Sequence, residues 1–87
     1  MRVLKKSIEV ISYTDLKGEI YPLRFRIATK DETLKVIKIN KILQRTTEKI
    51  AGNTMIVFRC QSLMKGTLKL FEIKYEISTC KWILYKI

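Results

Sequence analysis

The stretch Phe71-Glu72-Ile73-Lys74-Tyr75-Glu76-Ile77 decides the fold class of this chain. Its apolar side chains, at the odd-numbered positions, alternate with charged ones, and a period of two is that of a β-strand with one buried face. The charged face carries acid, base and acid in order, which suits pairing with charges on neighbouring strands. The stretch therefore predicts a half-buried strand.

Short segments rich in β-branched and aromatic residues recur on both sides of this strand, separated by stretches with turn chemistry. The turn stretches are Asp15–Gly18, Lys30–Glu32, Ala51–Asn53, Met64–Gly66 and Ser78–Thr79. Strands are predicted near residues 7 to 13, 20 to 28, 34 to 45, 54 to 62, 67 to 77 and 80 to 86. Turns at this spacing indicate an antiparallel meander of five or six strands.

The segment at residues 20 to 28 repeats the alternation. It places Leu23, Phe25 and Ile27 on the inward face of the predicted strand. Arg24 and Arg26 then project from the outward face, where water or a ligand can reach them.

The segment that follows allows two interpretations. Val36, Ile39 and Leu43 have the three-four spacing of an amphipathic helix, which would run near residues 33 to 51 and end at a glycine. On a helical wheel, however, Lys35 falls near the middle of the apolar arc. The many β-branched residues here also fit a pleated sheet better than a helix. A strand is therefore favoured, and an α+β sheet with one helix is the alternative.

We expect a single all-β domain spanning residues 1–87. With 87 residues the core is small, and a short meander buries most apolar surface by curling into a closed or half-closed barrel. The predicted architecture is an SH3-like or Sm-like barrel. No apolar stretch reaches the roughly 18 residues of a membrane span, and the N-terminus becomes charged too early for a secretion signal, so a cytoplasmic location is expected.

Two resemblances agree with this fold class. From Ala51-Gly52-Asn53 through Phe58-Arg59-Cys60-Gln61 to Lys81-Trp82-Ile83-Leu84-Tyr85-Lys86, the chain resembles a group of uncharacterised small all-β proteins of low-GC Gram-positive bacteria. Through Tyr13, Gly18, Pro22 and Lys38-Ile39-Asn40-Lys41-Ile42 it also resembles the WYL domain, an Sm-like module that binds nucleic-acid ligands. The chain departs from that family in lacking its Trp-Tyr-Leu triplet. The second resemblance implies fold class only.

Composition argues against catalysis and for a polyanionic partner. The chain has no histidine, no glycine-rich phosphate loop and only two cysteines, Cys60 and Cys80, so we expect no enzyme, no cofactor and no metal site. A small buried hydrophobe is the expected role of Cys60. Lysine and arginine number 18 against 8 acidic residues, a formal charge of +10, which favours an anionic partner.

Nucleic-acid binding is one of two functions that the residues suggest. Basic side chains on neighbouring segments could contact phosphates, and tyrosines beside the first turn could stack on bases of a single strand of RNA or DNA. The candidate residues are Tyr13, Tyr21, Arg24, Arg26, Lys35, Lys38, Lys41 and Arg45.

A protein-interaction or self-assembly module is the other function, and the sequence favours it over nucleic-acid binding. The segments at residues 54 to 62 and 80 to 86 are apolar on both faces, so one face would need a cover, which a symmetric homodimer supplies. The candidate interface residues are Met55, Val57, Leu63, Trp82 and Tyr85.

Overall fold

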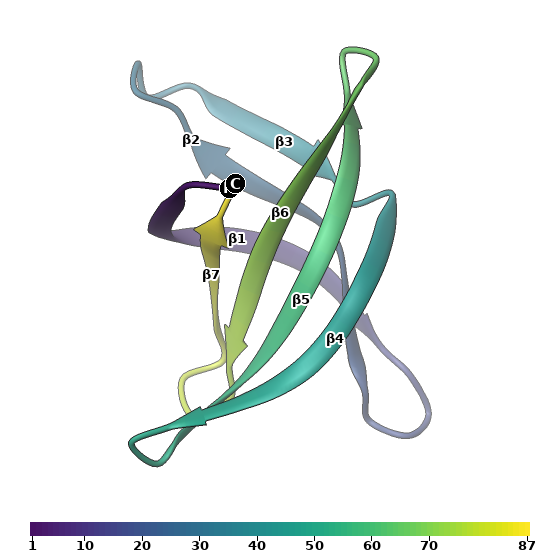
Figure 1. The fold of residues 1–87 in the computed structure, drawn as a ribbon, viewed down its shortest axis with the longest axis vertical. Helices are drawn as coiled ribbons and strands as arrows, with labels where there is room; N and C mark the ends of the chain where they lie inside the picture. The colour runs from purple at the N-terminus through teal and green to yellow at the C-terminus, as the bar shows by residue number, and fades with distance from the viewer.

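The computed structural model describes residues 1–87 and confirms the all-β fold class (Figure 1). It contains seven strands, one more than the sequence predicts, and no helix. The strands are β1 (Val3–Thr14), β2 (Ile20–Ala28), β3 (Leu34–Lys38), β4 (Lys41–Ile50), β5 (Asn53–Met64), β6 (Thr67–Glu76) and β7 (Lys81–Lys86).

The strands form one antiparallel sheet that curls into a half-closed barrel (Figure 1). Their order is β3-β2-β1-β7-β6-β5-β4, so the first and last strands of the chain pair in the middle of the sheet. The two sheet edges, β3 and β4, follow each other directly in the sequence. The barrel is therefore closed by the pairing of β1 with β7 and stays open between the two edge strands, β3 and β4.

The contested third segment is a bent pair of strands, so both the helix near residues 33 to 51 and the single strand at 34 to 45 are wrong. The bend is a corner at Ile39 and Asn40. The Ile39 N–H donates to the carbonyl of Leu23 on β2 at 3.0 Å, whereas the next N–H, of Asn40, donates to Gln61 on β5 at 3.1 Å. Since the chain changes neighbours between adjacent residues, a straight strand cannot continue through this point.

Two hairpins owe their tightness to residues with positive φ. Ala51 and Gly52 link β4 to β5 with φ of 50° and 82°, and Lys65 and Gly66 link β5 to β6 with φ of 49° and 78°. Two such residues in succession are typical of a type I′ turn, whose twist matches that of the flanking strands. The turn chemistry of the sequence therefore places both hairpins correctly.

A bulge in β2 changes one predicted orientation. The pairing of β1 with β2 slips at Leu23, because Ile11 lies opposite Arg24 and the next residue, Ser12, lies opposite Pro22. Leu23 is therefore not inward as predicted: it is 44% exposed, and Pro22 is buried in its place. Proline lacks an N–H, so a bulge is one of the few sites in a sheet that accept it.

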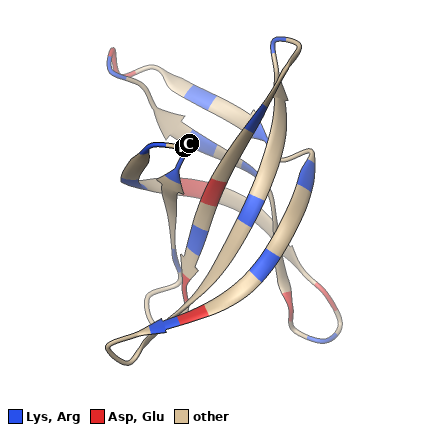
Figure 2. Cartoon of the chain, in the orientation of Figure 1, with Lys and Arg blue, Asp and Glu red and all other residues tan.

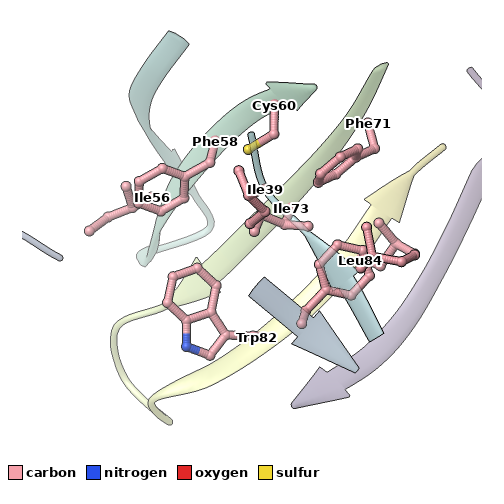
Figure 3. Close-up of a cluster of buried hydrophobic side chains, with 10 residues drawn as sticks. Ile39, Ile56, Phe58, Cys60, Phe71, Ile73, Trp82 and Leu84 are labelled. Atoms are coloured by element: carbon pink, nitrogen blue, oxygen red, sulfur yellow. The ribbon is translucent and has the colours of Figure 1, made fainter. Parts of the chain in front are cut away.

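The core fills the inside of the curl (Figure 3). Phe58 is fully buried, with its ring centroid 5.7 Å from that of Trp82, and Trp82 in turn packs on Tyr75 at 4.8 Å. At the other end, Phe25 meets Phe71 edge-on at 5.4 Å. The buried apolar residues are Phe25, Ile37, Ile39, Ile56, Phe58, Cys60, Phe71, Ile73, Trp82 and Leu84.

Candidate functional site

The outer face of β1, β2 and β3 gathers basic and apolar side chains. The strand register sets Ile11, Arg24 and Lys38 in one row across the three strands. The next row holds Glu9, Arg26 and Val36. We call the surface made by Ile11, Tyr13, Leu23, Arg24, Arg26, Val36 and Lys38 the basic face; Figure 2 shows Lys and Arg on β2 and β3 where these strands run side by side.

Arg24 and Lys38 stand directly opposite each other on this face. Both are exposed, and neither forms an ion pair with a carboxylate. Like charges in direct register destabilise a pair of strands. An anion between the two side chains would remove that repulsion, so this pair can bind a phosphate or a carboxylate group.

Arg26 differs from Arg24, because its charge is already matched within the chain. Its guanidinium Nη2 lies 2.8 Å from Glu9 Oε2, the residue opposite it on β1. Both side chains are open to solvent, with 44% of Arg26 and 72% of Glu9 exposed, so the pair adds little to stability. Arg26 therefore contributes less positive potential to the basic face than Arg24 or Lys38.

Two stacked tyrosines extend the basic face toward the β1–β2 hairpin. The rings of Tyr13 and Tyr21 lie 5.1 Å apart at an interplanar angle of 24°. The Tyr21 hydroxyl donates to Glu19 at 3.0 Å, a hydrogen bond that raises the pKa of Tyr21. Tyr13 is 51% exposed, so its ring offers a platform that is steadied from behind by Tyr21.

A hollow of about 550 Å³ lies on the basic face, around Arg24 and Lys38. It is lined by Ile11, Leu23, Arg24, Val36, Lys38 and Ile39. Aliphatic side chains on its walls can contact the flat faces of bases or apolar side chains of a protein, and the two cations can hold a negative charge. The Leu23 side chain forms one wall of the hollow because of the bulge in β2. In a regularly alternating strand this side chain would point into the core.

The remaining predicted basic residues do not join this face. Lys35 lies two residues before the buried Ile37 and thus on the other side of β3. Lys41 is exposed beyond the corner, at the start of β4. Arg45 lies opposite the buried Phe58 and places its guanidinium carbon 5.7 Å from the Phe58 ring centroid. The corner separates these β4 residues from the basic face.

The predicted interface residues occupy three different environments. Met55, Val57 and Leu63 alternate with the buried residues of β5 and so share its outer face. Trp82 lies in the core and is only 8% exposed, so its side chain is not available for contact with a second chain. Tyr85 makes a cation–π contact with Lys74, whose Nζ lies 3.6 Å from the centroid of the Tyr85 ring.

Lys74 is the one lysine that the structure buries. The sequence places it on the charged outer face of β6, yet only 7% of the residue is exposed. Its Nζ lies 3.0 Å from Glu48 Oε2, and the Tyr85 ring covers the ammonium group. Glu48 is on β4, two strands away, so the partner could not be read from the alternation of β6 alone.

Sequence reasoning missed Leu68 and Leu70 on the β5–β6 hairpin. Leu68 lies opposite Leu63, a predicted interface residue, and both are more than half exposed, at 60% and 57%. Leu70 on the same hairpin is 44% exposed. The signal was present, because the alternation of the β6 segment puts Leu68 and Leu70 in phase with its charged residues.

The two thiols are free and differ in environment. Cys60 is buried in the core, where desolvation raises its pKa to about 12. Cys80 is exposed at the end of the β6–β7 turn. No group of three or more acidic, cysteine or histidine side chains is close enough to hold a metal ion. The structure has no helix of the length and apolar character that would cross a membrane.

No family model, curated protein or solved structure matches the chain. The two resemblances drawn from the sequence stay predictions.

Proposed function

We propose that the basic face binds a single-stranded nucleic acid. The observation that carries this proposal is the direct opposition of Arg24 and Lys38, which are exposed and have no carboxylate partners, on the face that also carries the exposed ring of Tyr13. Cations hold the phosphates of a strand, while aromatic and aliphatic surfaces contact its bases. The net charge of +10 adds a general attraction for polyanions.

A single strand fits this surface better than a duplex. Its bases are free to lie on Tyr13 and in the hollow between Ile11 and Val36, whereas a duplex keeps its bases stacked inside. The bases of a single strand would then cover the exposed aliphatic residues. A bound duplex would leave these residues uncovered.

Fluorescence anisotropy with labelled single-stranded RNA, single-stranded DNA and duplex tests the proposal. We expect Arg24→Glu with Lys38→Glu to weaken single-strand binding at least about tenfold. The negative slope of log K against log salt should become shallower by about 1.4, or about 0.7 for each lost phosphate contact. The tyrosine is tested with Tyr13→Ala, which should weaken binding by about 1 to 3 kcal/mol.

A charge-matched control separates the site from composition. Lys49→Glu with Arg59→Glu makes the same change in net charge on exposed positions of β4 and β5. This control should retain most of the affinity. If both double variants lose affinity equally, the attraction belongs to net charge, and the proposed site is wrong.

Self-assembly is a second candidate function, supported by Leu63 and Leu68. Exposed leucines in direct register form an apolar ridge on the outer face of the β5–β6 hairpin, and Met55 and Val57 continue along the same face of β5. A two-fold axis through the ridge would bring Leu63 onto Leu68 of a second copy and cover both. This ridge lies on strands other than those of the basic face, so both functions can operate together.

A further inference from the structure

A second groove lies along the free edge of β3. It has a volume of about 600 Å³ and separates β3 from the turn end of the β5–β6 hairpin. On one side it is lined by four consecutive residues, Lys35 to Lys38. Opposite them stand residues of the hairpin, among them Leu63, Lys65 and Lys69. We call this the edge groove.

Four consecutive residues of β3 line the groove, which is typical of a groove that follows the edge of a strand. Side chains of neighbouring residues point to opposite faces, so a groove over one face is lined mainly by the side chains of every second residue. The edge is where an outer strand presents main-chain N–H and C=O groups that no neighbouring strand satisfies. β3 pairs with β2 alone, so its other edge is of this kind.

The hydrogen bonds to β2 show which main-chain groups face the groove. The Thr29 N–H donates to the Thr33 carbonyl, and the Ile39 N–H donates to that of Leu23. In an antiparallel ladder residues bond to the partner strand alternately. Lys35 and Ile37 therefore bond to β2, and Leu34 and Val36 direct their N–H and C=O groups into the edge groove.

One outward group is already satisfied across the groove. The Ser62 hydroxyl, on β5, donates to the carbonyl of Lys38 at 2.5 Å. This bond closes the inner end of the edge groove, next to the corner. The main-chain groups of Leu34 and Val36 lie beyond it and have no partner strand.

The charge of the edge groove selects its occupant. Lys35, Lys38, Lys65 and Lys69 line it, and no carboxylate does. A second copy of the chain pairing through β3 would bring Lys35 and Lys38 against the same lysines, so repulsion opposes that arrangement. A nucleic acid would satisfy the charges, but it has no peptide main chain with which to continue the ladder.

We propose that the edge groove binds an extended acidic peptide segment of a partner protein, which adds to β3 as a further strand. Main-chain hydrogen bonds to Leu34 and Val36 align the segment, and its carboxylates pair with Lys35, Lys65 and Lys69. Its apolar side chains lie against Val36 and Leu63. The edge groove lies on the opposite side of β3 from β2 and meets the basic face at Val36 and Lys38, which line both.

The test uses a short labelled peptide that alternates glutamate and valine. Its control is the same peptide N-methylated at its consecutive central residues, which keeps the charge and removes the N–H groups of both peptide edges. We expect the methylated form to bind at least about tenfold more weakly, because about two hydrogen bonds are lost. Lys65→Glu with Lys69→Glu should weaken the unmodified peptide by a similar factor, while Lys49→Glu with Arg59→Glu should not.

Hydrogen exchange gives a readout that a merely basic surface would not. Peptide binding should slow the exchange of the Leu34 and Val36 amides and leave those of Lys35 and Ile37, already bonded to β2, unchanged. Equal affinity for both peptides, or unchanged exchange at Leu34 and Val36, would overturn the proposal. Binding of an oligothymidylate is measured to the same Lys65→Glu with Lys69→Glu variant. If this variant loses as much affinity for the oligothymidylate as for the peptide, the groove is a nucleic-acid site and the proposal is wrong.

Discussion

At the scale of single residues, Glu76 links two turns of the barrel. Its carboxylate accepts hydrogen bonds from Thr79 at 2.5 Å and from Asn53 at 2.7 Å, one in the β6–β7 turn and one at the start of β5. These bonds, that of Thr79 first, hold the pKa of Glu76 below its usual value of 4.5, and the charge of Lys81 adds to the effect. The folded state therefore favours the ionised form.

This lowered pKa predicts a loss of stability in acid. The contribution of Glu76 is complete above about pH 4.5 and disappears as the pH falls through the folded pKa, because the unfolded chain takes up the proton first. We expect Glu76→Gln to be less stable than the parent at pH 7. The difference should shrink below pH 4.5.

Urea unfolding of both proteins at neutral and acid pH measures this effect. Glu9→Gln is a suitable control, since Glu9 is an exposed carboxylate with a single partner, Arg26. A Glu76→Gln difference that stays constant across the pH range would mean that the carboxylate charge has no part in holding the turns.

At the scale of elements, local pattern predicted strands and turns well. The alternation of residues 67 to 77 identifies β6, and the turn at Ala51 and Gly52 defines one hairpin, because both depend on neighbours in the sequence. The corner at Ile39 and Asn40 depends on which strands become neighbours in space. No local pattern contains that information, so the third segment was predicted as one strand.

The candidate site was predictable to the same extent. Arg24 and Lys38 come together because a short turn pairs β2 with β3, and that turn is visible in the sequence. Lys41 and Arg45 are predicted beside them because a continuous third strand would keep both on the segment that carries Lys38, and the corner instead places both on β4, next to β5. Lys35 is excluded from the basic face by the alternation of β3, which puts it on the same side as the buried Ile37. The edge groove could not be foreseen, since it exists only where β3 parts from β5.

The turn between β4 and β5 carries a strained residue. Ala51 has φ of 50°, a left-handed conformation that alanine adopts at a penalty of about 1 kcal/mol and that asparagine tolerates better. We expect Ala51→Asn to raise the free energy of unfolding by about 0.5 to 1 kcal/mol. Chemical denaturation measures it directly.

The same substitution elsewhere serves as its control. Ala28 is an exposed residue at the end of β2, where asparagine disfavours the strand. Ala28→Asn should leave stability unchanged or lower it. If Ala51→Asn lowers stability as well, the β4–β5 turn does not favour asparagine and its type I′ assignment is wrong.

At the scale of the whole molecule, charge and apolar surface act against each other in self-association. The leucine ridge on the β5–β6 hairpin favours contact between two copies, and a charge of +10 on each opposes it. Salt screens the repulsion over a distance of about 10 Å at 0.1 M and leaves the apolar contact in place. We therefore predict a homodimer whose population rises with salt.

Sedimentation velocity at low and moderate salt tests this prediction. Leu68→Glu should give a monomer under both conditions, because it places a charge in the centre of the ridge. Leu16→Glu, on the fully exposed β1–β2 turn, should behave as the parent does. A parent protein that stays monomeric at every salt concentration would rule out the ridge as a dimer contact.

The pairing of β1 with β7 has a further consequence for how the fold is encoded. Main-chain N–H and C=O groups of Arg2 and Ile87 bond to each other at 2.7 and 3.0 Å, so the two chain ends lie side by side (Figure 1). Neighbouring strands thus follow one another around the barrel, which is open only between β3 and β4, the two strands that the Ile39–Asn40 corner connects. A circular permutant joined across Arg2 and Ile87 and opened at that corner would run β4, β5, β6, β7, β1, β2, β3. Its sequence order would equal its sheet order, so every pairing would become local, and local pairing favours rapid folding.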